Sequence, residues 1–198
     1  MPHPIWLKAV GTAAALTLAV APTANAVSGP EPTGPATAAA STAAPVTLYY
    51  DDSRAVGWEA AIAAGVAIWN ANVDNVKLVE AGSGTRAEIQ IIATSGWPQA
   101  TLGPVRPGGR SRVELGSQAV AQGYDKIRIA AHEIGHNLGL PDTKPGPCSQ
   151  LMSGSSPGPG CRNALPNATE QARVESAYAN RTASPAPAGA GRVVVDAP

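Results

Sequence analysis

The residues best suited to chemistry form one short cluster in the second half of the 198-residue chain. From His132 to Asp142 the sequence reads H-E-I-G-H-N-L-G-L-P-D, which is the pattern H-E-x-x-H-x-x-G-x-x-D. Histidines four positions apart lie one above the other on a helix, so the imidazoles of His132 and His136 can reach the same ion. The spacing therefore predicts a metal-binding helix, and zinc is the metal that this pattern favours.

The phase of this helix separates a chemical face from an apolar one. At about 100° per residue, His136 falls roughly 40° and Glu133 roughly 100° away from His132. Glu133 can then reach a water on the metal without binding the metal, which is the position of a general base. The opposite face carries the apolar residues Ile127, Ala130, Ile134 and Leu138. We therefore predict that this face is buried against a core.

A third metal ligand must come from outside the helix, because a catalytic zinc has three protein ligands and a water. The chain has three histidines, and His3 lies in a segment that we expect to be removed, so an oxygen ligand is required. Gly139 can end the helix in the left-handed conformation, and Pro141 prevents its continuation. We predict that Asp142 then returns to the metal.

We therefore predict a zinc ion bound by His132, His136 and Asp142, with Glu133 as the catalytic residue. The alternative is an amphipathic helix that carries two surface histidines by chance. The helical phase, and the glycine and acid that follow at ligand spacing, favour the metal.

Length and charge restrict the class of protein. A chain of 198 residues is long enough for one domain with a substantial core. Lys plus Arg and Asp plus Glu both number 14, so nothing predicts binding to nucleic acid or to an anionic membrane. We expect a monomer.

The first part of the chain has the composition of export and linker segments. Residues 1–26 combine Lys8, an apolar run and the small-x-small site Ala24-Asn25-Ala26, which predicts a secretory signal peptide. The apolar run of about a dozen residues is too short for a membrane anchor. Residues 27–45 are a propeptide or a linker; they contain no cysteine or histidine, so we predict weak latency.

Hydrophobic periodicity predicts alternating strands and helices of an α/β domain from residue 46 onward. We expect an N-terminal helix over 55–72 and a closing helix over 167–178, and we expect Asp125 to cap the metal helix. The predicted strands are 46–50, 76–80, 87–93 and 110–115, the last at an edge. The composition of residues 182–198, rich in Ala, Pro and Gly, predicts a disordered C-terminal tail.

Arginines gather near the predicted edge strand, at Arg106, Arg110 and Arg112. They are either ordinary solvated charges or the rim of a cleft where a peptide could add as a strand. Cys148 and Cys161 follow an export signal and predict a disulfide, which by the loop-entropy argument is worth roughly 3 kcal/mol.

The metal motif, the segment Ala67-Ile68-Trp69-Asn70 and Met152 together resemble the snapalysin family of small secreted neutral zinc proteases of actinomycetes. The resemblance implies a zincin-type α/β domain over residues 46–181, with one mixed twisted sheet that positions the metal helix and a Met-turn loop in which Met152 lies beneath the metal. It also implies a preference for an aromatic residue just after the scissile bond, and calcium near Asp125.

We therefore predict a secreted zinc metalloendopeptidase whose partners are protein and peptide substrates. Two alternatives remain open at this point: a binding module with structural zinc, and a secreted amidase that acts on cell-wall peptides.

Overall fold

The computed structural model describes residues 44–179 and 191–198. The predicted signal peptide, and the predicted propeptide as far as residue 43, lie outside the described residues. The elements in chain order are β1 Val46–Arg54, α1 Glu59–Asn72, β2 Val76–Glu80, β3 Ile89–Thr94, β4 Gln99–Thr101, β5 Ser111–Gly116, α2 Ser117–Ala121, α3 Lys126–Asn137, the 3-10 turn η1 Leu151–Ser153, α4 Ala168–Ala179 and β6 Val193–Val195.

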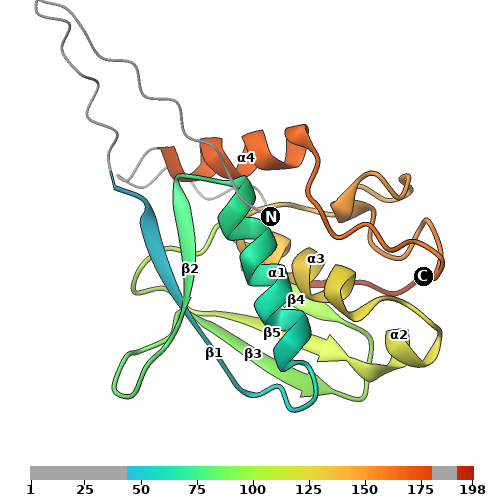
Figure 1. Cartoon of the computed structure of the whole chain (residues 1–198), viewed down its shortest axis with the longest axis horizontal. Coiled ribbons are helices and arrows are strands. Elements are labelled where there is room, and N and C mark those ends of the chain that lie inside the picture. The colour runs from blue at the N-terminus through green and yellow to red at the C-terminus, as the bar shows by residue number, and fades with distance from the viewer. Residues whose placement is uncertain (1–43, 180–190) are drawn as a thin grey trace, which may run out of the picture. The chain divides into compact units, whose positions relative to one another are not determined.

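A six-stranded mixed sheet in the order β2-β1-β3-β5-β4-β6 forms the framework (Figure 1). The pairs β1–β2, β1–β3 and β3–β5 are parallel, whereas β4 pairs antiparallel with both β5 and β6. Parallel neighbours need a crossover between them, and α1 provides the one from β1 to β2. The predicted α/β class with a mixed sheet is confirmed.

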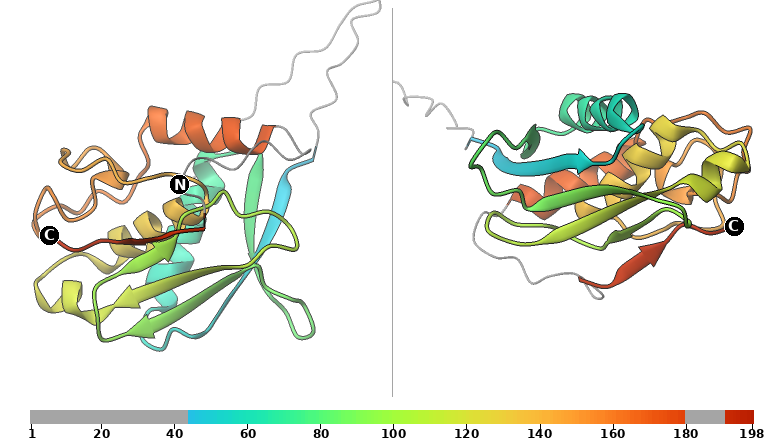
Figure 2. Two further views of the ribbon diagram at one scale, coloured as in Figure 1. Left: turned by 180° about the vertical axis from the view of Figure 1, so that it is seen from behind. Right: turned by 90° about the horizontal axis from the view of Figure 1, so that it is seen from below.

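The metal helix is held in place by close packing of α3 against α1, which lie on the same side of the sheet (Figure 2). A β-carbon on Gly65 of α1 would stand 3.1 Å from the backbone nitrogen of Ala131, so the absence of a side chain lets the two helices approach. The buried Trp69 donates a hydrogen bond from its indole nitrogen to the carbonyl of Ala131, at 2.8 Å. Both contacts fix the depth and rotation of α3 in the core.

Two sequence predictions about the sheet need correction. Strand β5 is internal rather than an edge strand, because residues 99–101, for which no strand was predicted, form β4 beside it. The predicted disordered tail also differs, since residues 193–195 form β6 next to β4. Strands of three residues are too short to produce a periodic signal, and the pairing of β4 with β6 depends on residues far apart in sequence.

Helix boundaries follow the local signals with small shifts. The first helix starts at Glu59 rather than at residue 55, and Gly57 precedes it with a φ of 83°. The apolar face of α3 is buried except for Ile127, which is 40% exposed. Among the residues that the structure describes, no helix combines the length and apolar character needed to cross a membrane.

The close approach of α1 and α3 can be tested by filling it. Gly65→Val should lower the free energy of unfolding by about 1–3 kcal/mol, because the added carbons meet the backbone of α3. Gly82→Val is the matched control, since a β-carbon at Gly82 meets nothing within 4 Å. Urea denaturation of both variants measures the difference, and equal losses of stability would contradict the packing described here.

Candidate metal centre

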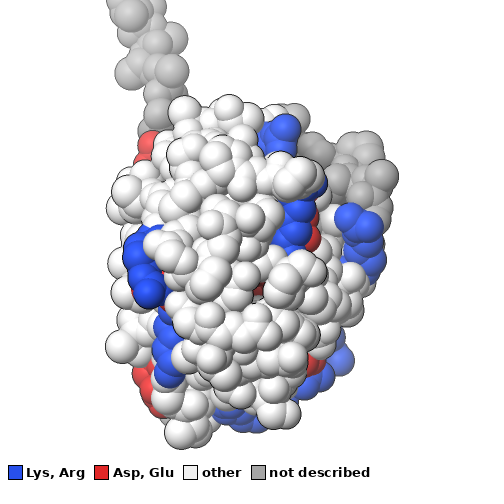
Figure 3. Space-filling model, turned by 90° about the vertical axis from the view of Figure 1, so that its right-hand side faces the viewer, with Lys and Arg blue, Asp and Glu red and all other residues white. Residues whose placement is uncertain are grey.

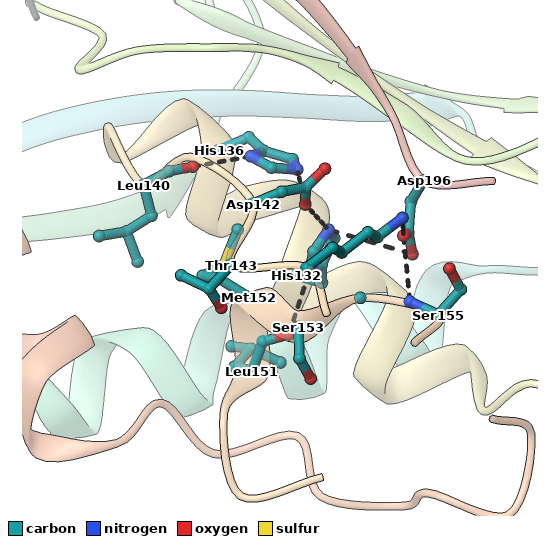
Figure 4. A network of polar contacts seen from close by, with 12 residues as sticks. His132, His136, Leu140, Asp142, Thr143, Leu151, Met152, Ser153, Ser155 and Asp196 are labelled. Carbon is teal, nitrogen blue, oxygen red and sulfur yellow. Dashed lines mark hydrogen bonds and ion pairs between the residues drawn. The ribbon is translucent and has the colours of Figure 1, made fainter. Parts of the chain in front are cut away.

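The two histidines of α3 and the aspartate that follows the helix converge on one point (Figure 4). The Asp142 Oδ1 atom lies 3.3 Å from His132 Nε2 and 3.4 Å from His136 Nε2. Zinc at its usual bond lengths holds neighbouring ligands of a tetrahedron about 3.3 Å apart. The structure therefore brings together all three residues that the sequence predicted as ligands, at the spacing of zinc donors.

The turn after α3 explains how Asp142 reaches this point. Gly139 adopts a φ of 103°, and the amide of Leu140 donates to the carbonyl of Gly135 at 3.1 Å, which is the closing hydrogen bond of a glycine-terminated helix. The same turn places the carbonyl of Leu140 2.7 Å from His136 Nδ1. The helix terminator therefore serves both the second histidine and the third ligand.

The outer hydrogen bonds of the imidazoles determine which nitrogen faces the site. His132 Nδ1 lies 3.0 Å from the carbonyl oxygen of Leu151, and His136 Nδ1 bonds in the same way to Leu140. A carbonyl oxygen only accepts, so both Nδ1 atoms carry the proton and both Nε2 atoms present a lone pair. Each histidine is thus prepared as a metal ligand.

Unpaired polar atoms mark the centre of the site. Within the described part of the chain, the buried atoms without a hydrogen-bond partner include both Nε2 atoms, Asp142 Oδ1 and both carboxylate oxygens of Glu133. Buried polar atoms are normally satisfied. When the imidazoles are neutral and the carboxylates ionised, only acceptors face one another, an unfavourable arrangement that a bound cation relieves. Two imidazoles and a carboxylate are a donor set that fits zinc with a fourth position open.

In the metal-free chain, the pKa values of the site residues show that the site carries an excess of negative charge. Burial would lower the pKa of His132, but Asp142 and the charges of Asp196 and Glu133 outweigh burial and raise this pKa to about 9. Burial raises the pKa of Glu133 well above its usual value; His132 lowers it, whereas Asp196 and Asp142 raise it further. The site therefore favours binding of positive charge.

A turn beneath α3 supports the histidines. Met152 in η1 is buried, and a β-carbon on Gly135 would stand only 2.8 Å from its sulfur. The carboxylate of Glu170, which also caps α4, accepts from the amides of Leu151 at 3.2 Å and Met152 at 2.8 Å. This arrangement holds the carbonyl of Leu151 against His132, and places Met152 under the metal helix as the resemblance implied.

Arg128 is a supporting residue that sequence reasoning missed. Its guanidinium is buried and donates to Ser153 Oγ at 3.0 Å and to the carbonyls of Gln150 and Gly154 at 3.1 and 3.2 Å. It therefore organises the loop around η1. The available signal was its position four residues before His132, which places it on the same face of the helix.

Asp125 caps α3 as predicted, because its Oδ1 accepts from the amide of Arg128 at 2.9 Å. Its Oδ2 lies 3.8 Å from the guanidinium of Arg162. Asp125 is in neither of the two groups of possible metal ligands found among residues 44–179 and 191–198. Calcium at Asp125 stays a prediction, and the contacts favour the cap.

The remaining sequence candidates have structural positions. Cys148 and Cys161 are paired in a disulfide, with their α-carbons 5.6 Å apart. Arg106 lies over the ring of Tyr178 and donates to the carbonyl of Ala177 at 2.7 Å, so it fastens α4 instead of joining a basic rim. Arg112 forms an ion pair with Glu114 at 3.0 Å.

One acidic residue near the site was not foreseen. Asp196, directly after β6, places its Oδ2 atom 4.0 Å from His132 Nε2 (Figure 4). In a space-filling view, acidic atoms are visible at the bottom of a hollow in a face that is otherwise largely uncharged (Figure 3). The pairing of β6 with β4, invisible in the sequence, brings Asp196 to this place.

Comparison with known proteins gives a consistent picture. Residues 45–181 match the Streptomyces extracellular neutral proteinase (M7) family. The extracellular small neutral protease of Streptomyces coelicolor is 43% identical over 141 residues, which are 71% of this chain and 63% of that protein. The chain thus spans less than two thirds of this relative. The protein of the same name from Streptomyces caespitosus is 43% identical over 135 residues, 68% of this chain and 98% of its own length.

Two solved structures are distantly similar. High choriolytic enzyme 1, a hatching enzyme zinc-protease from Oryzias latipes, aligns with a TM-score of 0.37 and 22% identity over 50% of this chain and 46% of its own. Myroilysin aligns with a TM-score of 0.44 and 14% identity over 71% of this chain and 87% of its own.

The donor set predicts a measurable loss when one ligand is removed. Asp142→Ala should weaken zinc binding by about 100-fold or more, because an unpaired oxygen at the centre of the site disappears. Asp74→Ala, at a fully exposed carboxylate, is the control. Zinc added to the metal-free chain should raise the melting temperature of the control but barely that of Asp142→Ala; equal shifts would show that zinc binds elsewhere.

Proposed function

The chain belongs to the Streptomyces extracellular neutral proteinase family, and on that premise we propose that it is a secreted zinc metalloendopeptidase that hydrolyses internal peptide bonds of proteins. One observation carries the proposal. The buried, unpaired donor atoms of His132, His136 and Asp142 converge at zinc-ligand spacing, and the unpaired carboxylate of Glu133 lies in the next position of the helix.

Glu133 is proposed as the general base. Zinc in this site would acidify a water molecule and polarise the carbonyl of the scissile bond. The carboxylate of Glu133 is fully buried and has no competing hydrogen bond in the described structure, so both oxygens are free to accept the proton of the attacking water. It then delivers that proton to the leaving amine. Burial, which raises the pKa of Glu133, favours holding the proton between these steps.

The substrate is proposed to lie extended along the sheet edge nearest the metal. A small recess beside His132 is lined in part by Trp97, Tyr124 and Ile129. The proposed preference for an aromatic residue just after the scissile bond rests on the family resemblance, because this recess is too small for an aromatic ring and is also lined by Arg128 and Asp196.

The domain organisation completes the proposal. Residues 1–26 would direct export and be removed, 27–45 would be a propeptide or linker, and 46–181 would be the catalytic domain, acting as a monomer. Export is supported by the relatives, which are named extracellular proteases.

A structural zinc site is the second candidate, and one observation favours it. Structural sites have four protein ligands, and Asp196 lies close enough to His132 and Glu133 to form a possible ligand group with them. The role of Glu133 separates the two candidates, since a structural site has no use for a base.

Replacement of the base gives a sharp test. Glu133→Gln should lower casein hydrolysis by about 10²- to 10⁴-fold, the usual contribution of general base catalysis, while bound zinc stays at one equivalent by elemental analysis. Glu80→Gln, at an exposed position at the end of β2, should match the wild type. Undiminished hydrolysis by Glu133→Gln would refute the assigned role.

The choice of substrate class can be tested directly. The protein should digest casein but not peptidoglycan, and a chelator such as 1,10-phenanthroline should abolish digestion until zinc is restored. Release of peptidoglycan fragments with casein left intact would instead identify a cell-wall amidase.

A further inference from the structure

We propose that residues 192–198 are a built-in inhibitor of the metal site: β6 occupies the sheet edge where a substrate would pair, and Asp196 places a carboxylate beside His132, where it obstructs the open side of the metal site. The inference rests on the proposed function and adds a regulatory state to it. These residues lie outside the segment 45–181 that matches the family.

The backbone of this segment follows β4 as an added strand. Val193, Val194 and Val195 face Thr101, Ala100 and Gln99 in antiparallel register. The ladder extends beyond the strand at both ends, since Leu102 donates to the carbonyl of Arg192 at 2.8 Å and Asp196 donates to the carbonyl of Pro98 at 2.9 Å.

An exposed sheet edge presents free amides and carbonyls, and an extended peptide can bind there by adding a strand. Because β6 is the outermost strand beside β4, the segment takes up the edge that a substrate would need (Figure 2).

The side chain of Asp196 is directed from this strand toward the metal site (Figure 4). It is only 7% exposed. Its Oδ1 accepts from the amide of Ser155 at 3.1 Å and forms an ion pair with Lys144. Its Oδ2 lies 4.0 Å from His132 Nε2, and these two residues with Glu133 form the second group of possible metal ligands in the described chain.

The surroundings are shaped for this carboxylate. Gly154 lies directly beside Asp196, and a β-carbon there would overlap the carboxylate. The next residue is also held, because the carbonyl of Ala197 accepts from Lys144 Nζ at 2.9 Å and from Ser155 Oγ at 3.0 Å. The segment is therefore anchored on both sides of Asp196.

The charges explain why a carboxylate is tolerated in a buried place. A buried ionised group is costly unless it is paired. One oxygen of Asp196 is paired with Lys144, and the other faces the site. A divalent cation together with the Lys144 ammonium would balance the three carboxylates of Glu133, Asp142 and Asp196.

The consequence for activity follows from the coordination of zinc. The fourth position is the one that a catalytic site leaves for water, so a carboxylate held beside His132 and Glu133 obstructs the approach of substrate to that position. Only Val194 of the three β6 side chains is buried, so release of the segment exposes little apolar surface. The segment competes with substrate intramolecularly, and its departure would open both the edge of β4 and the metal.

The test uses the full chain with cobalt in place of zinc and acetohydroxamate as a probe of the open metal position. Asp196→Asn should bind acetohydroxamate at least about tenfold more tightly than the wild type, because no tethered carboxylate competes. Its zinc affinity, measured against a chelator, should fall about tenfold or more. Casein hydrolysis should rise. Val195→Thr, an exposed neighbour in the same strand, should match the wild type in every measurement.

A second variant guards against a folding defect at position 196. Val194→Lys removes the one buried valine of β6 and leaves every metal ligand in place, so it should raise acetohydroxamate affinity in the same way. Unchanged acetohydroxamate affinity in both variants would overturn the inference. If acetohydroxamate and zinc binding change as expected but no variant digests casein, the inhibitor stands and the proposed protease function fails.

Discussion

The site depends on a repulsion between acceptor groups that bound positive charge relieves, whether a proton on His132 or a metal ion. The buried Asp142 Oδ1 atom lies 3.3 and 3.4 Å from the Nε2 atoms of His132 and His136, and all three atoms are acceptors when the imidazoles are neutral. Such an arrangement costs free energy in the empty site, and the rest of the fold has to hold it together. Binding of zinc removes this repulsion, so the free energy of unfolding of the domain increases when zinc is bound.

Several layers of contacts maintain this arrangement. The close approach of α1 at Gly65 fixes the position of α3, while carbonyls of Leu140 and Leu151 orient the histidines. Behind them, Glu170 and Arg128 bind the backbone of the η1 loop. These residues touch no substrate in the proposed mechanism, yet each determines where a nitrogen lone pair points. Rigid support of this kind distinguishes a prepared metal site from a chance group of donors.

The sheet contributes a second constraint through its edge. Strand β4 is short and antiparallel to β5, and it lies on the side of the sheet that leads to the metal. An edge that can receive a substrate strand can also receive the chain's own residues. In the proposed function and the proposed inhibition, the same backbone geometry would serve catalysis and its restraint, and the carboxylate of Asp196 would connect the two.

Local sequence was sufficient to predict the helix and the three side chains that converge beside it. The four-residue spacing of His132 and His136, the terminator Gly139 and the cap Asp125 all act within a few residues, so their geometry follows from helical periodicity alone. The strands 76–80 and 110–115 were visible for the same reason. The roles of β4, β6, Arg128 and Asp196 could not be read in this way, because they depend on pairing and burial between distant segments. Asp196 lies 64 positions after His132 in the sequence, and only the strand pairing of the folded chain brings the two side chains together.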